Sequence, residues 1–523
     1  MPDNYNALPD PWRRAVSLIS IARRSLIFLV LPAAFAAAQT AEQKTARYLD
    51  SVRKQPSLLL AFLHDMPKGG DLHNHLDGAT YAEDLIDFAV SDGLCVDRTT
   101  SGLIAPPCDS CEKYTPKPGI RCAYDDHVLY NQIIDAWSMR NWRPGDESGH
   151  DHFFATFDKF SLASHGHVAD AIASVINRAA REHVQYIEFM HTADGRAAAE
   201  LGMKLGWDSD FAKMRDRLLD GGLREIAAAT SKTLADNETR VRAELKCGTT
   251  EAELGCSVTV RYLYQVLRGL PHEAVFAQIL LACELASSDA RFVGLNLVMP
   301  EDWYVPIRDF NEHMAMLDYL HGVYPKVHIT LHAGELAIGL VKPEDLTFHI
   351  RASVERGHAE RIGHGVDIML EKDPIGLMKE MAARNVLVEI NLTSEDQILG
   401  VSGDDHPLPI YMKYGVPVAI STDDQGVARS DMTYEYLRAV QDFHLSYTEL
   451  KRMTRQSLEH SFLPGASLWA QTRPAFHTAA ACASDALGGE KPSATCARFL
   501  AANARVREQW RLEKEFARFE KSF

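Results

Sequence analysis

The hydrophobic pattern of this chain alternates between short β-type apolar runs and longer segments of helical periodicity. The short runs predict eight strands, at residues 70–73, 184–190, 257–262, 292–298, 327–332, 361–363, 386–391 and 417–422. Helical periodicity separates most of them, as at 167–183, 271–287 and 374–384. This alternation predicts parallel βαβ units, and eight units predict an α/β fold of the (β/α)8 TIM-barrel type.

Additions to the barrel are expected on both sides of it and within it. Helical segments are predicted at 39–66 and at 441–523, flanking a barrel domain at 67–440. Two insertions interrupt the alternation, a Cys-rich one after the first strand at about 93–150 and a mostly helical one at about 192–256. The C-terminal extension is expected to cover the outside or the bottom of the barrel.

The first residues read as an export signal. Arg13, Arg14, Arg23 and Arg24 precede an apolar run at 26–31, and small residues lead to an exit with alanine at 36 and 38. A basic region, a short apolar core and such an exit predict a signal peptide at 1–38, cleaved before Gln39. The run is shorter than the roughly 20 residues of a spanning helix. We expect a periplasmic or secreted protein; an uncleaved anchor or a mis-assigned start codon are the alternatives.

Composition and cysteine usage agree with a soluble exported domain. Apolar residues make up 46% of the chain, and the net charge of -16 gives a nucleic-acid partner little electrostatic support. Of the nine cysteines, four lie at 95–122, and two further pairs are close in sequence, Cys247 with Cys256 and Cys482 with Cys496. Clustered pairs suit disulfides in an oxidising compartment. Cys283 is left as a buried free thiol, and the pairing among the first four stays open.

The first predicted strand ends in a pair of histidines. His73 and His75 are two residues apart, so on an extended strand both side chains point to the same side. At the carboxyl end of a barrel strand that side is the mouth, where such enzymes build their sites. The alternative is a histidine pair on a surface strand.

Three later strands also end in residues that can bind a metal or move a proton. His332 ends one strand and is followed by a glycine and Glu335, His364 lies between two glycines, and Asp423 with Asp424 closes the last strand. Each motif alone is compatible with a structural role. Together they bring three imidazoles and one carboxylate to four strand ends, which predicts a metal site.

The donor types favour one zinc ion. Three nitrogens and one oxygen suit Zn²⁺ with a position left for water, whose pKa zinc lowers towards about 7. A two-metal site on this fold usually needs a carboxylated lysine at the end of the fourth strand, and residues 294–298 offer none.

A second zinc motif is rejected. Cys108 and Cys111 match half of the cytidine-deaminase signature, and His358 with Glu360 matches the other half. The halves stand in the wrong order and far apart, and exported cysteines are expected in disulfides.

In these motifs the chain resembles the adenosine deaminase family, including the secreted branch related to adenosine-deaminase growth factors. Met66-Pro67-Lys68-Gly69 resembles the secreted branch, and the segment His73 to Ala79 resembles the main family. The other motifs occur in the family's order, and the resemblance covers about residues 66–440.

The resemblance implies a role for each motif residue. It implies one zinc ion bound by His73, His75, His332 and Asp423. Glu335 would protonate N1 of the purine, and His364 would orient the attacking hydroxide with help from Asp423. The residues implied to contact the substrate are His75, Asp77 at the ribose 5′-hydroxyl, Gly294 at N3, Asp424 at N7, and Phe153 and Phe157 on a covering helix. For the two phenylalanines an ordinary core helix is the alternative.

The resulting expectation is zinc-dependent deamination of adenosine or 2′-deoxyadenosine to inosine or deoxyinosine, serving purine salvage. A carboxylate at Asp77 disfavours a 5′-phosphate. A mononuclear amidohydrolase acting on adenine, a modified adenosine or another amine is one alternative. A non-catalytic binding or signalling barrel is the other. The partner is a small purine nucleoside, with no nucleic acid and no stable membrane span after signal cleavage, and a homodimer is compatible with the sequence.

Overall fold

The computed structural model describes residues 39–523 except 113 and 146, and the predicted signal peptide lies outside this part. Eight parallel strands form one sheet in the order β1-β4-β5-β6-β7-β8-β9-β10. Their bounds are Gly69–His75, Val184–His191, Thr259–Leu267, Phe292–Val298, His328–Ala333, Arg361–His364, Leu387–Ile390 and Val418–Ile420. All eight predicted strands are confirmed.

The sheet closes on itself at the carboxyl ends of β1 and β10. Asn74 and Asp423 form a parallel bridge, in which Asp423 N donates to His73 O at 2.8 Å and His75 N donates to Asp423 O at 3.2 Å. The (β/α)8 fold is therefore confirmed. The closure also fixes Asp423 beside the two histidines of β1.

The largest difference in a strand boundary concerns β5. The apolar pattern ended this strand at Tyr262, whereas the structure continues it to Leu267. Gln265 lies in this continuation, and its side chain contacts His75. The prediction therefore ended this strand five residues too early.

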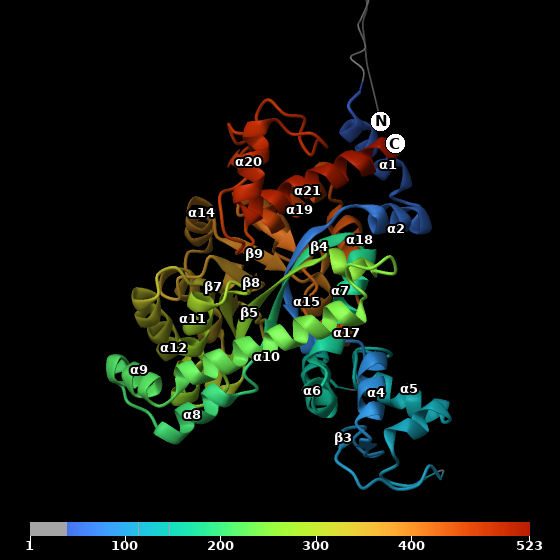
Figure 1. The fold of residues 1–523 in the computed structure, drawn as a ribbon, viewed down its shortest axis with the longest axis vertical. Coiled ribbons are helices and arrows are strands. Elements are labelled where there is room, and N and C mark those ends of the chain that lie inside the picture. Colours follow the sequence, from blue (N-terminus) through green and yellow to red (C-terminus); the bar gives the residue numbers. More distant parts are fainter. Residues whose placement is uncertain (1–38, 113, 146) are drawn as a thin grey trace, which may run out of the picture. The chain divides into compact units, whose positions relative to one another are not determined.

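Helices surround the strands, as Figure 1 shows. Between successive strands from β5 onward the main helices are α11 His272–Ser288, α12 Tyr304–Val323, α13 His349–Glu355, α14 Pro374–Arg384, α15 Leu392–Leu399 and α16 Leu408–Tyr414. The helices predicted at 167–183, 271–287 and 374–384 are confirmed as α7 Val168–Arg181, α11 and α14. Near the start of the described part, α1 Ala41–Val52 and α2 Pro56–Asp65 occupy the segment expected to be helical.

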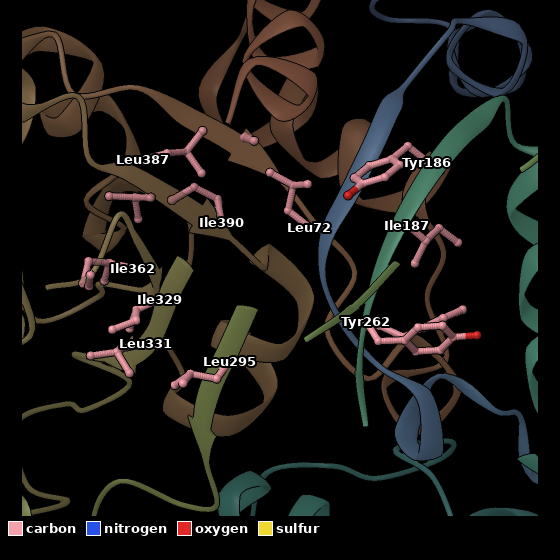
Figure 2. Packing of buried hydrophobic residues seen from close by; sticks show 14 of the residues in the cluster. Leu72, Tyr186, Ile187, Tyr262, Leu295, Ile329, Leu331, Ile362, Leu387 and Ile390 are labelled. Atoms are coloured by element: carbon pink, nitrogen blue, oxygen red, sulfur yellow. The ribbon is translucent and has the colours of Figure 1, made fainter. Parts of the chain in front are cut away.

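The two faces of the barrel strands differ in polarity. Leu72, Ile187 and Ile362 are buried in the hydrophobic core (Figure 2), and burial of apolar surface is worth about 25 cal/mol per Å². The neighbouring residues point to the opposite face. There Arg361 is fully buried and pairs with Glu188 at 2.7 Å and Glu389 at 2.6 Å. A charge is tolerated at this depth because both carboxylates compensate it.

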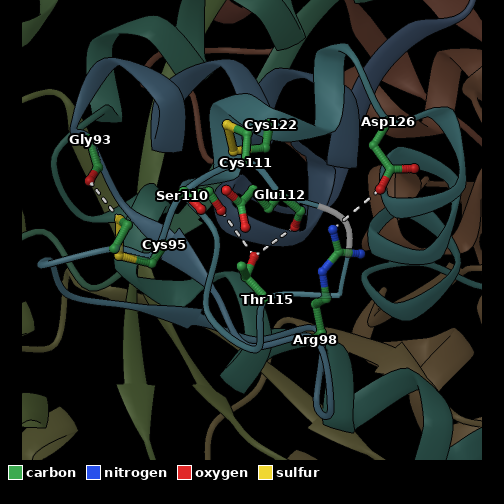
Figure 3. The surroundings of a disulfide bond; sticks show 10 residues. Gly93, Cys95, Arg98, Ser110, Cys111, Glu112, Thr115, Cys122 and Asp126 are labelled. Carbon is green, nitrogen blue, oxygen red and sulfur yellow. Dashed lines mark hydrogen bonds and ion pairs between the residues drawn. A yellow bond between two sulfur atoms is a disulfide. The ribbon is translucent and has the colours of Figure 1, made fainter.

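The Cys-rich insertion is a small lobe whose buried residues share one hydrophobic cluster with the segments 82–89 and 153–163. It contains the antiparallel pair β2 Cys95–Val96 and β3 Leu103–Ile104, then η1 Ile120–Tyr124 and α5 His127–Ala136. Disulfides join Cys95 to Cys108 and Cys111 to Cys122 (Figure 3). Cys108 and Cys111 therefore belong to two different disulfides, which confirms that they are not a zinc motif.

Helices α3 Leu76–Ala79, α4 Ala82–Ser91 and α6 Gly149–Ser164 complete the connection from β1 to β4. The second insertion is formed by α8 Ala197–Leu205, α9 Phe211–Asp220 and α10 Leu223–Glu244. It ends near the predicted disulfide between Cys247 and Cys256, which is confirmed.

The C-terminal part is mainly helical, with one short hairpin in the irregular segment between residues 460 and 493. The helices after β10 are α17 Gln425–Ala428, α18 Met432–Phe443, α19 Tyr447–Glu459, α20 Ala494–Ala502 and α21 Ala504–Phe519. The hairpin of β11 Trp469–Gln471 and β12 His477–Thr478 was not predicted. The Cys482–Cys496 disulfide and the free buried Cys283 are as predicted. Among the described residues, no helix combines the length and hydropathy needed to cross a membrane.

Candidate active site

Side chains from three strand ends converge at the closure of the barrel. His73 Nε2 lies 3.1 Å from His332 Nε2, and His75 Nε2 lies 3.2 Å from the same atom. Asp423 Oδ1 is 3.3 Å from Nε2 of both His73 and His75. The structure thus brings together the four residues that the sequence predicted as metal ligands.

Each of the three histidines forms a hydrogen bond to an oxygen acceptor on the side away from the cluster. His73 Nδ1 donates to Glu389 Oε2 at 2.7 Å, and His75 Nδ1 donates to Gln265 Oε1 at 2.9 Å. His332 Nδ1 donates to Asn296 Oδ1 at 2.9 Å. A proton on each Nδ1 leaves an Nε2 lone pair directed at the centre of the cluster.

This arrangement fits a metal cation. With a proton on each Nδ1, three Nε2 lone pairs face one another at near hydrogen-bond distance, and the buried Asp423 Oδ1 has no hydrogen-bond partner. Burial and the adjacent imidazoles lower the pKa of His332 well below its ordinary value, which favours the neutral, ligating form. A cation at the centre would balance the converging lone pairs and the carboxylate.

This region contains two sets of donor atoms, and within each set all the atoms lie within 4.8 Å of one another. One comprises His73, His332, His364 and Asp423, and the other His75, Asp423 and Asp424. The sets share Asp423, and His364 therefore lies in the same cluster. Its Nε2 is 3.6 Å from Glu335 Oε1, and its Nδ1 is 3.4 Å from Glu395 Oε1.

Glu335 lies beside the cluster and is almost completely buried. Its backbone N donates to Glu301 Oε2 at 2.9 Å, which fixes the turn after β7. Burial raises the pKa of the Glu335 carboxyl above its ordinary value and favours the protonated form. A protonated carboxylic acid next to a metal-type cluster can serve as a proton donor.

Local backbone geometry aims the end of the last strand into the site. Asp423 and His364 both adopt left-handed backbone conformations, with φ of 56° and 68°. Non-glycine residues adopt this conformation uncommonly. Gly78 leaves room for Asp424, since a Cβ there would lie 1.7 Å from Asp424 Oδ1.

A cavity of about 470 Å³ opens onto the cluster. His75, His332, Glu335, Asp423 and Asp424 form its polar end. Phe153 and Phe157 of α6 contribute to the apolar part of its wall, together with Trp303 and Ile398. Its volume lies in the range of small-molecule sites. Asp77 lines a neighbouring cavity instead, which shares part of its wall with this one.

The structure does not bring Gly294 to the cavity. Gly294 is the third residue of β6, and its backbone lies against His328 of the next strand. The wall is formed instead by Val298, Met299 and Pro300 at the carboxyl end of β6. A contact from Gly294 to a purine is therefore not available, and this prediction is corrected.

Sequence reasoning missed the residues that hold the histidines. Gln265, Asn296 and Glu389 each lie within an apolar strand and face the barrel interior. A lone polar residue inside a buried strand is the signal that could have found them. Glu188 pairs with Arg361 away from the cavity wall.

A (β/α)8 barrel that gathers histidines and an aspartate at its strand ends defines a metal-dependent hydrolase. Residues 144–468 match the family model described as adenosine deaminase, and the chain belongs to this family. The matched region contains His332, Glu335, His364 and Asp423, and it begins after His73 and His75.

Curated relatives extend the likeness to most of the chain. Adenosine deaminase of Shewanella loihica is 25% identical over 395 residues, which cover 75% of this chain and 93% of that protein. Adenosine deaminase of Escherichia coli (strain SMS-3-5) is 37% identical over 137 residues, which cover 26% of this chain and 38% of that protein.

Solved structures with a similar course of the chain act on different substrates. An N6-mAMP deaminase of Arabidopsis is 20% identical, with a TM-score of 0.49 over 77% of this chain and 96% of that one. An adenine deaminase of Arthrobacter aurescens is 16% identical, with a TM-score of 0.47 over 76% of this chain and 94% of that one. Likenesses this distant transfer no substrate to the present chain.

Proposed function

We propose that this protein hydrolyses adenosine or 2′-deoxyadenosine to inosine or deoxyinosine and ammonia, using one zinc ion. The observation that carries the proposal is the convergence of three imidazoles and Asp423 beside a buried Glu335, at the polar end of one cavity in an adenosine deaminase family member. Water replaces the 6-amino group of the purine, so the C6–N bond breaks and a C6–O bond forms.

The proposed zinc ligands are His73, His75, His332 and Asp423. Three nitrogens and one oxygen match the preference of Zn²⁺, and the outward hydrogen bonds keep the Nε2 atoms available. When bound, the zinc would supply Lewis acidity that makes a water nucleophilic at neutral pH. We leave His364 out of the ligand set because its Nε2 faces Glu335.

Glu335 and His364 are proposed to move and position protons around C6. Glu335 would hold a proton and give it to N1 of the purine as C6 becomes tetrahedral. His364, between Glu335 and Glu395, would orient the water and stabilise negative charge on the oxygen added to C6. Asp423 would assist as an acceptor for the proton of the water.

The remaining contacts are proposed to orient the nucleoside. Burial and the neighbouring Asp423 raise the pKa of Asp424 to about 8, so a protonated Asp424 would donate a hydrogen bond to N7. His75 would lie next to the base. Phe153 and Phe157 would cover its apolar face. Asp77 would accept a hydrogen bond from the ribose 5′-hydroxyl at the border of the neighbouring cavity.

We also propose that the protein works outside the cytoplasm after loss of a signal peptide at 1–38. Four disulfides support an oxidising compartment. The catalytic domain would comprise residues 67–440, with residues 39–66 and 441–523 as helical additions.

The test is the absorbance change from adenosine to inosine, measured with purified protein and with Glu335→Gln. Loss of the acid removes proton donation, which contributes typically 10²–10⁴-fold, so kcat is expected to fall by at least about 100-fold. Glu344→Gln, at an exposed position of η3 Pro343–Leu346, serves as the matched control and should retain wild-type rates.

A zinc-loaded protein that fails to release ammonia from adenosine and 2′-deoxyadenosine would overturn the proposed substrate. A Glu335→Gln variant with wild-type kcat would overturn the role of Glu335 alone.

A further inference from the structure

A second and larger cavity lies next to the proposed active site. Its volume is about 750 Å³, and it lies between α6, the carboxyl end of β4 and one face of α10. Phe157, Asp158, Gln265 and Leu267 line both cavities, so the two share a wall. Ala229 and Thr233 of α10 are exposed, and the cavity is therefore open to solvent on that side.

Gln265 links this cavity to the proposed metal site. Its Oε1 accepts from His75 Nδ1 at 2.9 Å, and its Nε2 lies 3.5 Å from Thr192 Oγ1 on the wall of the second cavity. A molecule in the second cavity thus lies one side chain away from a proposed zinc ligand.

The position of Asp77 indicates which part of a substrate would reach this cavity. In adenosine the 6-amino group and the 5′-hydroxyl stand at opposite ends of the molecule. With C6 held at the metal site, the 5′ end must point away from it. Asp77, two residues after His75, lines the second cavity and not the first, so the 5′ end would meet it there.

The charges of the wall select among 5′ substituents. Asp77, Asp158 and Asp194 contribute three carboxylates, and Arg196 is the only Lys or Arg among the described residues that line the cavity. Asp194 is partly compensated, since Tyr264 donates to it at 2.7 Å. An excess of negative charge repels a phosphate and tolerates a neutral or cationic group. Phe157, Phe160 and Leu267 add apolar surface for a bulky substituent.

We propose that the second cavity is a subsite for the 5′ substituent of extended adenosine nucleosides, those whose 5′ group is neutral or cationic. This inference rests on the proposed function, because C6 must be held at the metal site for the 5′ end to face Asp77. The substrate class is thereby widened from adenosine to 5′-modified adenosines, with 5′-phosphates excluded.

The experiment compares kcat/KM of the zinc-loaded protein for four probes that are deaminated at the same carbon. They are adenosine, 5′-deoxy-5′-(benzylthio)adenosine, 5′-amino-5′-deoxyadenosine and adenosine 5′-monophosphate. We expect the benzylthio and amino probes to stay within about tenfold of adenosine, whereas the monophosphate should fall at least about 100-fold below it.

Two variants of α10 test whether the second cavity binds the 5′ substituent. Ala229→Trp would fill the cavity and should lower the ratio of benzylthio to adenosine kcat/KM at least about tenfold. Ala228→Trp is the matched control, because Ala228 is exposed on the same helix and does not line the cavity, and this ratio should not change.

The outcomes separate the inference from the function on which it rests. Turnover of adenosine without turnover of the benzylthio and amino probes would overturn the subsite and leave the deaminase function intact. An equal effect of Ala229→Trp on kcat/KM for adenosine and for the benzylthio probe would do the same. Turnover of extended probes without adenosine would support the subsite and overturn adenosine as the substrate. No turnover of any probe would overturn the proposed function.

Discussion

The positions of His73, His75 and His332 are fixed because each imidazole ring forms a hydrogen bond on the side away from the cluster. Their outward partners are a carboxylate and two amide oxygens, Glu389, Gln265 and Asn296. Such partners fix the ring orientation and the protonated nitrogen of a ligating histidine. The geometry of the site thus depends on residues outside the predicted set of metal ligands.

Gln265→Leu tests this dependence at the residue scale. Leucine has a similar volume but offers no acceptor to His75 Nδ1, so the ring loses its fixed orientation. We expect the Kd for zinc, measured by chelator competition, to rise about 10–100-fold.

Thr192→Val is the matched control, because Thr192 bonds the opposite side of Gln265 and contacts no histidine of the cluster. A Gln265→Leu variant that binds zinc as tightly as the wild type would show that the outer hydrogen bond does not matter.

At the scale of elements, most of the site residues that the sequence could predict lie at the ends of strands. The motifs around His73, His332, His364 and Asp423 all follow apolar runs, and apolar runs mark parallel strands that are buried on both faces. The barrel and the residues at its mouth were therefore predictable.

Side chains inside the strands were not predictable in the same way. The contact of Gln265 was not predictable, because its partner His75 is 190 residues away in the sequence. Gly294 was misplaced because a single sequence does not tell how far along β6 the cavity begins. The pairing of Cys95 with Cys108 likewise depends on a local fold that spacing leaves open.

Helix α6 covers the cavity with Phe153 and Phe157, and its start is packed closely on α15. A Cβ at Gly149 would lie 1.8 Å from Gln397 O, so Gly149→Ala must displace the first turn of α6. We expect a higher KM for adenosine with a smaller change in kcat, and a loss of about 1–3 kcal/mol in the free energy of unfolding.

Gly322→Ala in α12 provides the comparison, since nothing lies within 4 Å of a Cβ there. Replacing a helical glycine in open space should be neutral or stabilise by about 0.5–1 kcal/mol. Wild-type KM and stability in Gly149→Ala would contradict a covering role for α6.

At the scale of the whole molecule, disulfides secure the segments added to the barrel. Two cross-link the Cys-rich lobe, one lies at the end of the second insertion, and one joins segments of the C-terminal extension. Each closes a short loop of surface chain, which restricts the unfolded state. The barrel itself contains only the buried thiol of Cys283 among the described residues.

Thiol titration of the denatured protein tests this pattern. Without reductant we expect one reactive thiol per chain, that of Cys283, and after reduction all nine cysteines should react. Protein purified from an oxidising compartment that shows nine thiols without reductant would contradict the disulfide assignment.

The most direct test of the account as a whole is ammonia release from adenosine before and after metal exchange. We predict that chelation abolishes activity and lowers Tm, since a metal that binds only the folded state stabilises it. One zinc ion per chain should restore both. Full activity in protein shown by elemental analysis to contain no metal would contradict the account, and so would zinc-loaded protein that leaves adenosine unchanged.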